Sequence, residues 1–262
     1  MKTRLYSLTI ALLLSCISSA ATVNFSTYTL VYDAPGTDVG DQYRFEDITT
    51  QDGANVDGLL TVTGSTVSDA GFVPVESISG NDVRMRMSHE LGHATLRFDF
   101  VQDGSSTLIT TPLTDVTILF DDIDSDLGRD GSDFAGVLSS DFENVLLNTD
   151  TLLRVSNNIV SGYTIAHLQS DANGTYADWG NNTSTDAIGQ SPNSVAFDIP
   201  STNSINFVVG QLGPIAGFRH IDLDITPDFR LISPTIIQVP EPTTPALLLL
   251  SLSALLSRRA RR

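Results

Sequence analysis

The 262-residue chain is short of cysteine and of positive charge. It has one cysteine, Cys16, and 14 basic residues against 31 acidic ones, for a net charge of −17. So few cations argue against nucleic acid as a partner, because its binding depends on neutralising phosphates with lysine and arginine. Hydrophobic residues make up 41% of the chain and charged residues 17%. This composition is that of a folded globular protein and excludes wholesale disorder.

The N-terminal segment, residues 1–21, has the layout of a secretory signal peptide. Lys2 and Arg4 precede a short apolar run, and small residues follow up to Ala21. The run is too short to span a membrane stably. Cleavage near Ala21 removes Cys16, so the mature chain would contain no cysteine and no disulfide. Lipid attachment at Cys16 and a buried core helix are the alternatives.

The last 24 residues, 239–262, carry three elements in order: a Val-Pro-Glu-Pro motif, an apolar run over 246–256 and an arginine cluster. The run is shorter than the roughly 20 residues that span a bilayer, which indicates a transient membrane insertion. The arginines are expected to stay on the cytoplasmic side of the membrane. The residues of the motif and of the cluster are Pro240, Glu241, Pro242, Arg258, Arg259, Arg261 and Arg262.

This C-terminal segment resembles the PEP-CTERM sorting signal of Gram-negative bacteria that make extracellular polysaccharide. The resemblance implies that an exosortase-type membrane processing enzyme is a partner and cuts at the motif of residues 240–242. It further implies that the protein is released or transferred to the cell envelope or matrix. The resemblance covers only the last 24 residues, and a simple C-terminal tail anchor is the alternative.

Residues 22–238 form the body between these two ends. The body keeps eight basic residues, all arginine, and 30 acidic ones, for a net charge of −22. Such a surface repels anionic polymers and membranes unless divalent cations neutralise it. We therefore divide the chain into a signal peptide (1–21), one domain (22–238) and a sorting segment (239–262).

The body is predicted to be all-β, a single domain of the β-sandwich or jelly-roll type. Apolar and polar residues alternate strictly in Val83–Met87 and Leu96–Phe100, and Val116–Phe120 is a continuous apolar run suited to a strand buried on both faces. No stretch keeps a 3.6-residue period for three turns, although 141–147 is compatible with one short helix. Further strand-like runs are Thr22–Tyr32, Gly58–Thr63, Tyr163–Leu168, Val195–Ile199, Ile205–Val209 and Phe218–Ile225.

A literal match to the zinc motif H-E-x-x-H occurs at His89–His93. On a helix, this spacing places His89 and His93 on one face as zinc ligands, with Glu90 poised to activate the bound water. Zincin peptidases often show the same string. The alternating runs on both sides leave about eight residues between two strands, so we expect a hairpin loop instead of a helix. Candidates for a third ligand are Asp99, Glu143, His167 and His220.

Acidic residues crowd segment 120–134. Carboxylates at this density repel one another, and calcium, which takes about six to eight oxygen ligands, is their natural partner outside the cell. The EF-hand pattern fits only in part, because Leu127 replaces its glycine and Asp133 replaces its glutamate. We expect a strand-to-loop calcium site on the sandwich rim, the alternative being a solvated loop held by Arg129. The candidate ligands are Asp122, Asp124, Asp126, Asp130 and Asp133.

His220, Asp222 and Asp224 recur at every second position near the end of the body. A histidine and two carboxylates on one strand face suit acid–base chemistry or a metal edge. The alternation favours another interpretation, in which Ile221 and Leu223 face the core and the polar side chains face water.

Together these features predict an exported, non-enzymatic protein of the cell envelope or extracellular matrix. Its predicted role is structural or the binding of polysaccharide or another polymer, with calcium as the expected metal and zinc not expected. No nucleophile elbow, phosphate loop or dinucleotide fingerprint occurs in the sequence. A secreted zinc metallopeptidase using the motif at His89–His93 is the alternative. A carbohydrate-active enzyme whose carboxylates the sequence does not single out is a third interpretation.

Overall fold

The computed structural model describes most of the body and neither end of the chain. The predicted signal peptide and sorting segment therefore lie outside the described residues, and both stay predictions. The described residues are 23–34, 38–68, 71–79, 82–87, 91–125, 131–149, 151–157, 159–168, 170, 193–213, 219–225 and 234–237.

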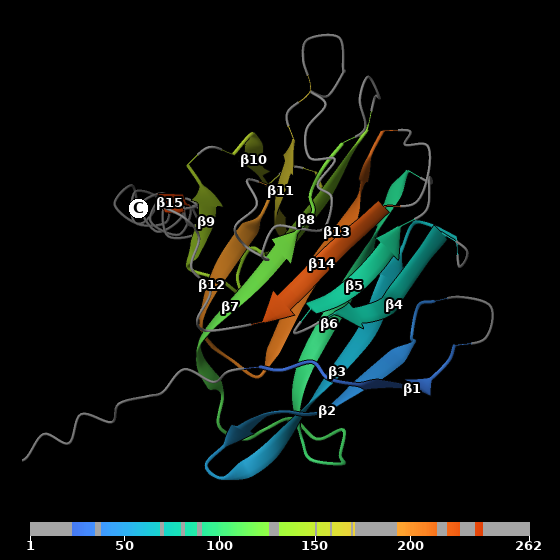
Figure 1. The fold of residues 1–262 in the computed structure, drawn as a ribbon, viewed down its shortest axis with the longest axis vertical. Helices are drawn as coiled ribbons and strands as arrows, with labels where there is room; N and C mark the ends of the chain where they lie inside the picture. The colour runs from blue at the N-terminus through green and yellow to red at the C-terminus, as the bar shows by residue number, and fades with distance from the viewer. Residues whose placement is uncertain are drawn as a thin grey trace, which may run out of the picture.

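The fold consists of two antiparallel sheets that pack face to face (Figure 1). In sheet order, the eight-stranded sheet contains β1 (Tyr28–Tyr32), β2 (Gln42–Gln51), β3 (Ala54–Ser65), β6 (Gly92–Gln102), β13 (Ser204–Leu212), β8 (Ser132–Leu138), β11 (Tyr163–Leu168) and β10 (Leu153–Ser156). The seven-stranded sheet contains β15 (Pro234–Ile237), β9 (Asn144–Asn148), β12 (Val195–Thr202), β7 (Leu113–Asp121), β14 (Arg219–Ile225), β5 (Asp82–Met87) and β4 (Phe72–Ser79). The predicted all-β sandwich is confirmed.

The core lies between the two sheets and is built from the apolar positions of the alternating strands. Met85 and Met87 of β5 and Phe98 of β6 are fully buried in one cluster, as the alternation predicted. The apolar run over residues 116–120 is buried along its whole length, because β7 lies in the middle of its sheet and is covered on both faces. Burying these side chains is the main favourable term in folding.

Two local predictions were wrong. Residues 141–147 form a turn followed by β9 and no helix, because β9 pairs with both β12 and β15 and so satisfies its backbone in the sheet. The expected β5–β6 hairpin is also absent, since β5 belongs to the seven-stranded sheet and β6 to the other. The chain therefore passes from one sheet to the other between Met87 and Gly92, and each of the two strands turns its apolar face to the shared interior.

Candidate functional site

The zinc motif falls at the start of a strand. His89 and Glu90 lie outside the described residues, whereas His93 lies in β6 opposite Gly210 of β13. Because β6 begins at Gly92, the second half of the motif has extended backbone where a zincin site requires helix. Burial lowers the pKa of His93, which favours a neutral ring. The described part of the motif therefore lacks the backbone geometry of the zinc peptidase interpretation.

The other histidines are dispersed over the fold. His93 and His167 lie in one cross-strand row of the eight-stranded sheet, separated by β13 and β8. Three inter-strand spacings place them about 14 Å apart, too far to share a metal ion. His220 lies in the other sheet, where its Nε2 is 2.9 Å from a carboxylate oxygen of Glu76.

Three of the five predicted calcium ligands are described: Asp122, Asp124 and Asp133. Asp126 and Asp130 lie outside the described residues. The N–H of Asp133 donates to the carbonyl oxygen of Asp124 at 2.9 Å, so the two ends of the acidic segment meet. Burial, followed by the charge of Asp124, raises the pKa of Asp122 to about 7. Because Asp124 and Asp133 are buried, a fully solvated loop is wrong at these two positions, while the calcium site itself stays a prediction.

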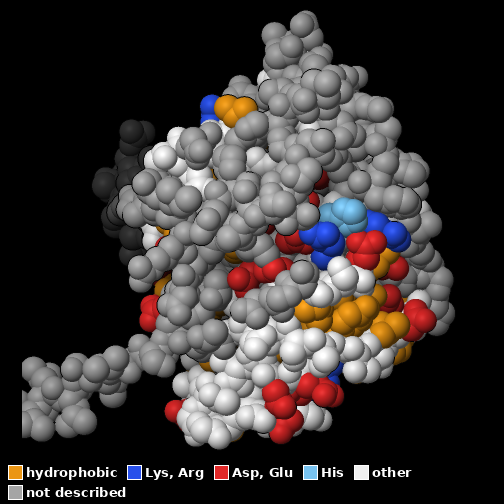
Figure 2. Space-filling view, viewed as in Figure 1, with side chains coloured by type: hydrophobic (Ala, Val, Ile, Leu, Met, Phe, Trp, Pro, Cys, Tyr) orange, Lys and Arg blue, Asp and Glu red, His pale blue; other side chains and the backbone are white. Residues whose placement is uncertain are grey.

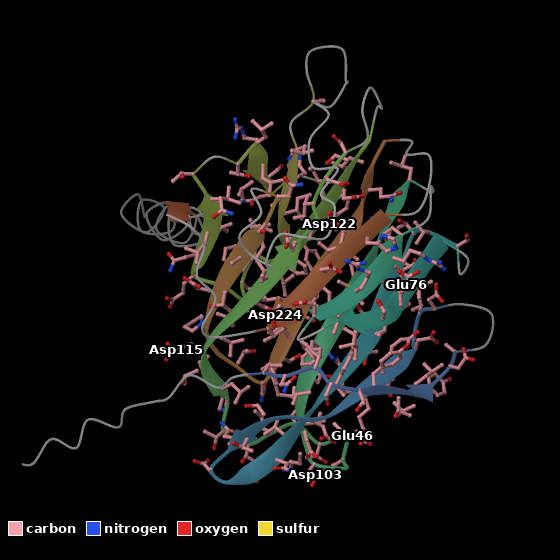
Figure 3. All side chains as sticks on the ribbon, in the orientation of Figure 1. Glu46, Glu76, Asp103, Asp115, Asp122 and Asp224 are labelled. Carbon is pink, nitrogen blue, oxygen red and sulfur yellow. The ribbon has the colours of Figure 1, made fainter. Side chains whose placement is uncertain are left out.

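Among the described residues, three carboxylates converge at a different place, at the rim formed by β2, β3 and the end of β6. Asp47, Asp57 and Asp103 each place a carboxylate oxygen within 4.8 Å of the others. Figure 3 labels Asp103 at this rim. Asp57 is 1% exposed, and its Oδ2 accepts hydrogen bonds from Arg44 Nη1 and the N–H of Gly104, both at 2.9 Å. Its Oδ1 accepts from the N–H of Asp47 at 3.0 Å. Asp57 therefore joins the bulge of β2 to the turn that follows β6.

A groove of about 670 Å³ adjoins these carboxylates at the tip of the β2–β3 hairpin. Its walls combine amide, carboxylate and hydroxyl groups with the apolar side chains of Ala54, Val56 and Ile109, and none of its lining residues is aromatic. The polar side chains that line it include Gln51, Asn55, Gln102, Asp103, Thr110 and Thr111.

The polar residues of β14 are less exposed than the alternation predicted. Ile221 and Leu223 face the core as expected. Asp222, however, accepts two hydrogen bonds from Arg84, at 2.8 Å from Nε and 2.7 Å from Nη2, and Asp224 is only 9% exposed. Figure 2 shows acidic, arginine and histidine side chains gathered on the face of the seven-stranded sheet. The solvated-face interpretation is therefore wrong for Asp224.

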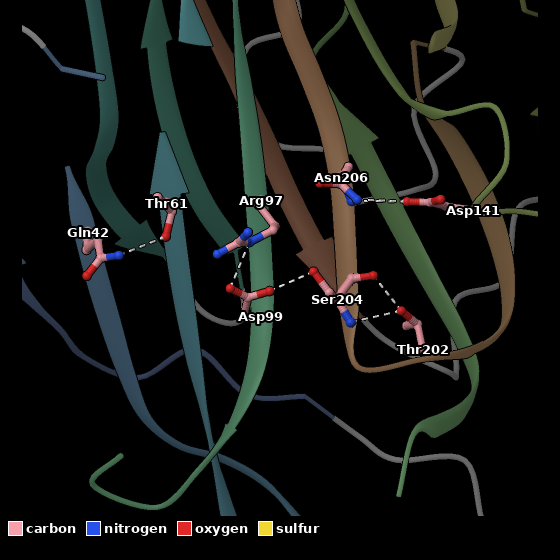
Figure 4. A network of polar contacts seen from close by, with 8 residues as sticks. All are labelled: Gln42, Thr61, Arg97, Asp99, Asp141, Thr202, Ser204 and Asn206. Carbon is pink, nitrogen blue, oxygen red and sulfur yellow. Dashed lines mark hydrogen bonds and ion pairs between the residues drawn. The ribbon is translucent and has the colours of Figure 1, made fainter. Parts of the chain in front are cut away.

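The outer face of the eight-stranded sheet carries a row of polar side chains that the sequence did not reveal (Figure 4). Gln42 of β2, Thr61 of β3, Arg97 of β6 and Asn206 of β13 lie directly opposite one another in the strand pairing. We call these four residues the polar row. With about 4.8 Å between neighbouring strands, the polar row is about 14 Å long. Polar positions alternate within each strand, but only the register aligns them.

Hydrogen bonds hold the side chains of the polar row and its neighbours in place. Gln42 Nε2 lies 3.5 Å from Thr61 Oγ1, at the limit of a hydrogen bond. Arg97 Nε donates to Asp99 Oδ2 at 2.9 Å, and Ser204 Oγ donates to Asp99 Oδ1 at 2.6 Å (Figure 4). The side chains are therefore arranged before any ligand arrives.

The polar row ends in a second groove, of about 410 Å³, between the β12–β13 hairpin and the turn after β8. Asn206 Nδ2 donates to Asp141 Oδ2 at 3.1 Å across it, and the ring of Phe142 packs edge-on against Phe197 with centroids 5.1 Å apart. The groove extends the polar row with further acceptors and an aromatic ring. Lining residues include Asp141, Phe142, Glu143, Thr202, Ser204 and Asn206.

The sorting motif and its arginine cluster have no described coordinates. Pro240, Glu241 and Pro242 lie outside the described residues, as do all four terminal arginines. Within the described ranges, no helix has the length and hydropathy needed to cross a bilayer.

No family model matches the chain, and no curated protein matches it either. Solved structures with remote similarity include three bacterial ones. The N-terminal domain of a Streptococcus gordonii adhesin has a TM-score of 0.48 and 12% identity, over 80% of this chain and 61% of that one. Glucan binding protein C of Streptococcus mutans has a TM-score of 0.43 and 14% identity, over 81% and 68%. The adhesin domain of PrgB from Enterococcus faecalis has a TM-score of 0.31 and 13% identity, over 72% and 63%.

These similarities concern the fold alone. The chain spans about 61% of the length of the first of these structures, so even the first similarity extends over only part of that protein. The ligands and partners of those proteins carry no conclusion about this chain.

Proposed function

We propose that the chain is an exported, non-enzymatic protein of the cell envelope or extracellular matrix that binds a neutral extracellular polysaccharide along the polar row. The observation that carries this proposal is the register that aligns Gln42, Thr61, Arg97 and Asn206 across four strands. Sugar hydroxyls both donate and accept hydrogen bonds. Amide, hydroxyl and guanidinium groups supply matching donors and acceptors at regular intervals.

Electrostatics favour a neutral polymer over an anionic one. The body carries a net charge of −22, which repels polyanions. At the polar row itself, the charge of Arg97 is balanced by Asp99 at 2.9 Å, so the row is close to neutral. A neutral polysaccharide with many hydroxyls can therefore approach without the cost of desolvating charges and without the repulsion that a charged polysaccharide would meet.

The rigidity of the polar row supports binding with little loss of entropy. Its four strands lie side by side in the sheet, and the hydrogen bonds around Asp99 and Asn206 already restrict several of the side chains. Immobilising a free side chain on binding costs about 0.5–1.5 kcal/mol, and a pre-arranged surface avoids part of that cost.

Alanine substitutions in the polar row are expected to weaken polysaccharide binding. Arg97→Ala and Asn206→Ala should each reduce affinity about 2- to 10-fold, since one hydrogen bond contributes about 0.5–1.5 kcal/mol. Affinity electrophoresis of the full-length protein through gels containing neutral or anionic polysaccharides measures the effect. Asn144→Ala, on the opposite sheet, and Asn55→Ala, in the rim groove, are matched controls. Equal losses in the controls, or no retardation of the wild-type protein, would contradict the proposal.

The export part of the proposal is supported by the sequences of the two ends. Processing at the Pro-Glu-Pro motif requires the motif itself, so replacing Pro240, Glu241 and Pro242 by alanine should leave an unshortened chain in the membrane fraction. The measurement is cell fractionation with mass spectrometry of the C-terminus, in a bacterium that contains an exosortase-type enzyme. Glu46→Ala, an exposed glutamate elsewhere, is the control. A triple variant that is shortened like the wild type would rule out processing at this motif.

A further inference from the structure

We infer that the outer face of the seven-stranded sheet holds a divalent-cation site of the calcium type, centred on Asp82 of β5 and Asp224 of β14. The two strands pair in register from Arg219 opposite Met87 to Leu223 opposite Val83. Continuing that register by one position places Asp224 directly opposite Asp82. Opposite residues of an antiparallel pair have Cβ atoms about 4.5–5.5 Å apart, so the two carboxylates share one small region.

Asp224 has an acceptor atom that the protein does not satisfy. Its side chain is 9% exposed, and its Oδ1 is buried without a hydrogen-bond partner in the described chain. Asp82, across the strand pair, is 8% exposed. A buried carboxylate oxygen without a donor is costly, because water is lost and nothing replaces it. A cation between the two carboxylates would supply the missing interaction.

The surroundings concentrate negative charge around this pair. In the adjacent row, Asp222 lies between Arg84 of β5 and Asp121 of β7. The two rows thus hold four aspartates and one arginine, and that arginine is already engaged in the bidentate contact with Asp222. Four carboxylates with one cationic partner leave an excess of negative charge in a partly desolvated place, which attracts a cation.

Burial opposes the charged state of both central carboxyls when no cation is present. Burial, followed by the charge of Asp224, raises the pKa of Asp82 to about 7. Burial also raises the pKa of Asp224 to about 6. These directions agree with the geometry, since both side chains are nearly covered and lie opposite each other.

Calcium suits this site better than a softer metal, because all the groups offered are oxygen atoms. Two carboxylates leave most of its coordination sphere to water and backbone oxygen, so we expect a dissociation constant of about 0.1–1 mM, the range of extracellular calcium modules. Asp122 of the predicted loop site lies apart from Asp224 in Figure 3, although it directly follows Asp121 of the adjacent row. The proposed cation site lies on the opposite sheet from the polar row and does not depend on polysaccharide binding.

The substitution Asp224→Asn tests the site, because it should lower stability relative to the wild type when calcium is present but not when calcium is removed. Calcium chloride should raise the unfolding midpoint of the full-length wild-type protein by a few degrees, and the variant should lose that rise. In EDTA the variant should be as stable as the wild type or more stable, since a buried repulsive charge is removed. Isothermal titration with calcium chloride should show one bound ion fewer per chain.

Three further variants make the result specific. Asp82→Asn should behave like Asp224→Asn, whereas Asp115→Asn, which removes an equal charge from an exposed position on β7, should bind calcium like the wild type. A variant Asp224→Asn that keeps the calcium-dependent rise and the full stoichiometry would overturn the inference. So would complete loss of calcium binding in Asp122→Asn alone, because the ion would then sit in the acidic loop.

Discussion

Replacing Asp57 by alanine is expected to lower the free energy of unfolding by about 3–5 kcal/mol, the cost of removing one partner from a buried ion pair. The carboxylate is 1% exposed and receives donors from the side chain of Arg44 and from the backbone of Asp47 and Gly104. Truncation leaves the mostly buried guanidinium of Arg44 without this partner and deprives both N–H groups of their acceptor. The bulge of β2 and the turn after β6 would lose the contact that joins them.

Urea unfolding followed by circular dichroism measures this loss. Asp103→Ala is the matched control, because Asp103 belongs to the same group of carboxylates but is exposed, and its substitution should change stability by less than about 0.5 kcal/mol. Asp57→Asn should fall between the two, since an amide keeps one acceptor. Equal losses for Asp57→Ala and Asp103→Ala would show that the carboxylates act as a unit and that Asp57 is not the residue that joins the bulge to the turn.

Phe98→Ala is expected to cost about 3–5 kcal/mol, the usual loss when a large aromatic side chain is removed from a core. Phe98 is fully buried, and its ring centroid lies 5.7 Å from Phe25, 6.0 Å from Phe45 and 5.3 Å from Phe100. The ring also occupies the space over Gly58, where any added Cβ would meet it. One side chain therefore joins β2, β3 and β6, and its loss leaves a cavity between three strands.

The conservative variant Phe98→Leu is the control for a general failure to fold. It keeps most of the buried area and should lower the free energy of unfolding by about 1.5 kcal/mol or less. Thermal and urea unfolding of both variants provide the comparison. Arg97 of the polar row immediately precedes Phe98 in β6 but points to the opposite face. Polysaccharide binding should therefore survive in Phe98→Leu. A loss below about 1 kcal/mol for Phe98→Ala would show that the aromatic cluster does not hold these strands together.

Strict alternation revealed the strands whose two faces differ, such as Val83–Met87 in β5 and Leu96–Phe100 in β6. It missed β2, because a bulge at Asp47, with a left-handed backbone (φ 53°), breaks the alternation between Phe45 and Ile48. It also missed β8, where both faces are covered and even the polar residues at its start are buried, so no alternation remains. The period of a strand is visible only where one face meets water.

For the candidate sites too, the local sequence pattern predicted only part of what the structure shows. Composition and spacing indicated the acidic segment at 120–134, and the alternation of β14 indicated which of its residues face the core. The burial of Asp224 was hidden, because it depends on the tertiary environment of β14 and not on β14 alone. The zinc motif at His89–His93 shows that matching letters do not ensure the matching backbone, since its last two residues begin β6 where a zincin site requires a helix.

The sequence by itself determined that this chain is acidic and all-β in its body, because these are properties of composition and of local pattern. The export segments at its two ends stay predictions. Only the tertiary structure decided which side chains meet. The polar row joins Gln42 to Asn206, and the proposed cation site joins Asp82 to Asp224, through the register of strands that are far apart in the chain. That register results from packing two whole sheets around one core, so no local segment contains it.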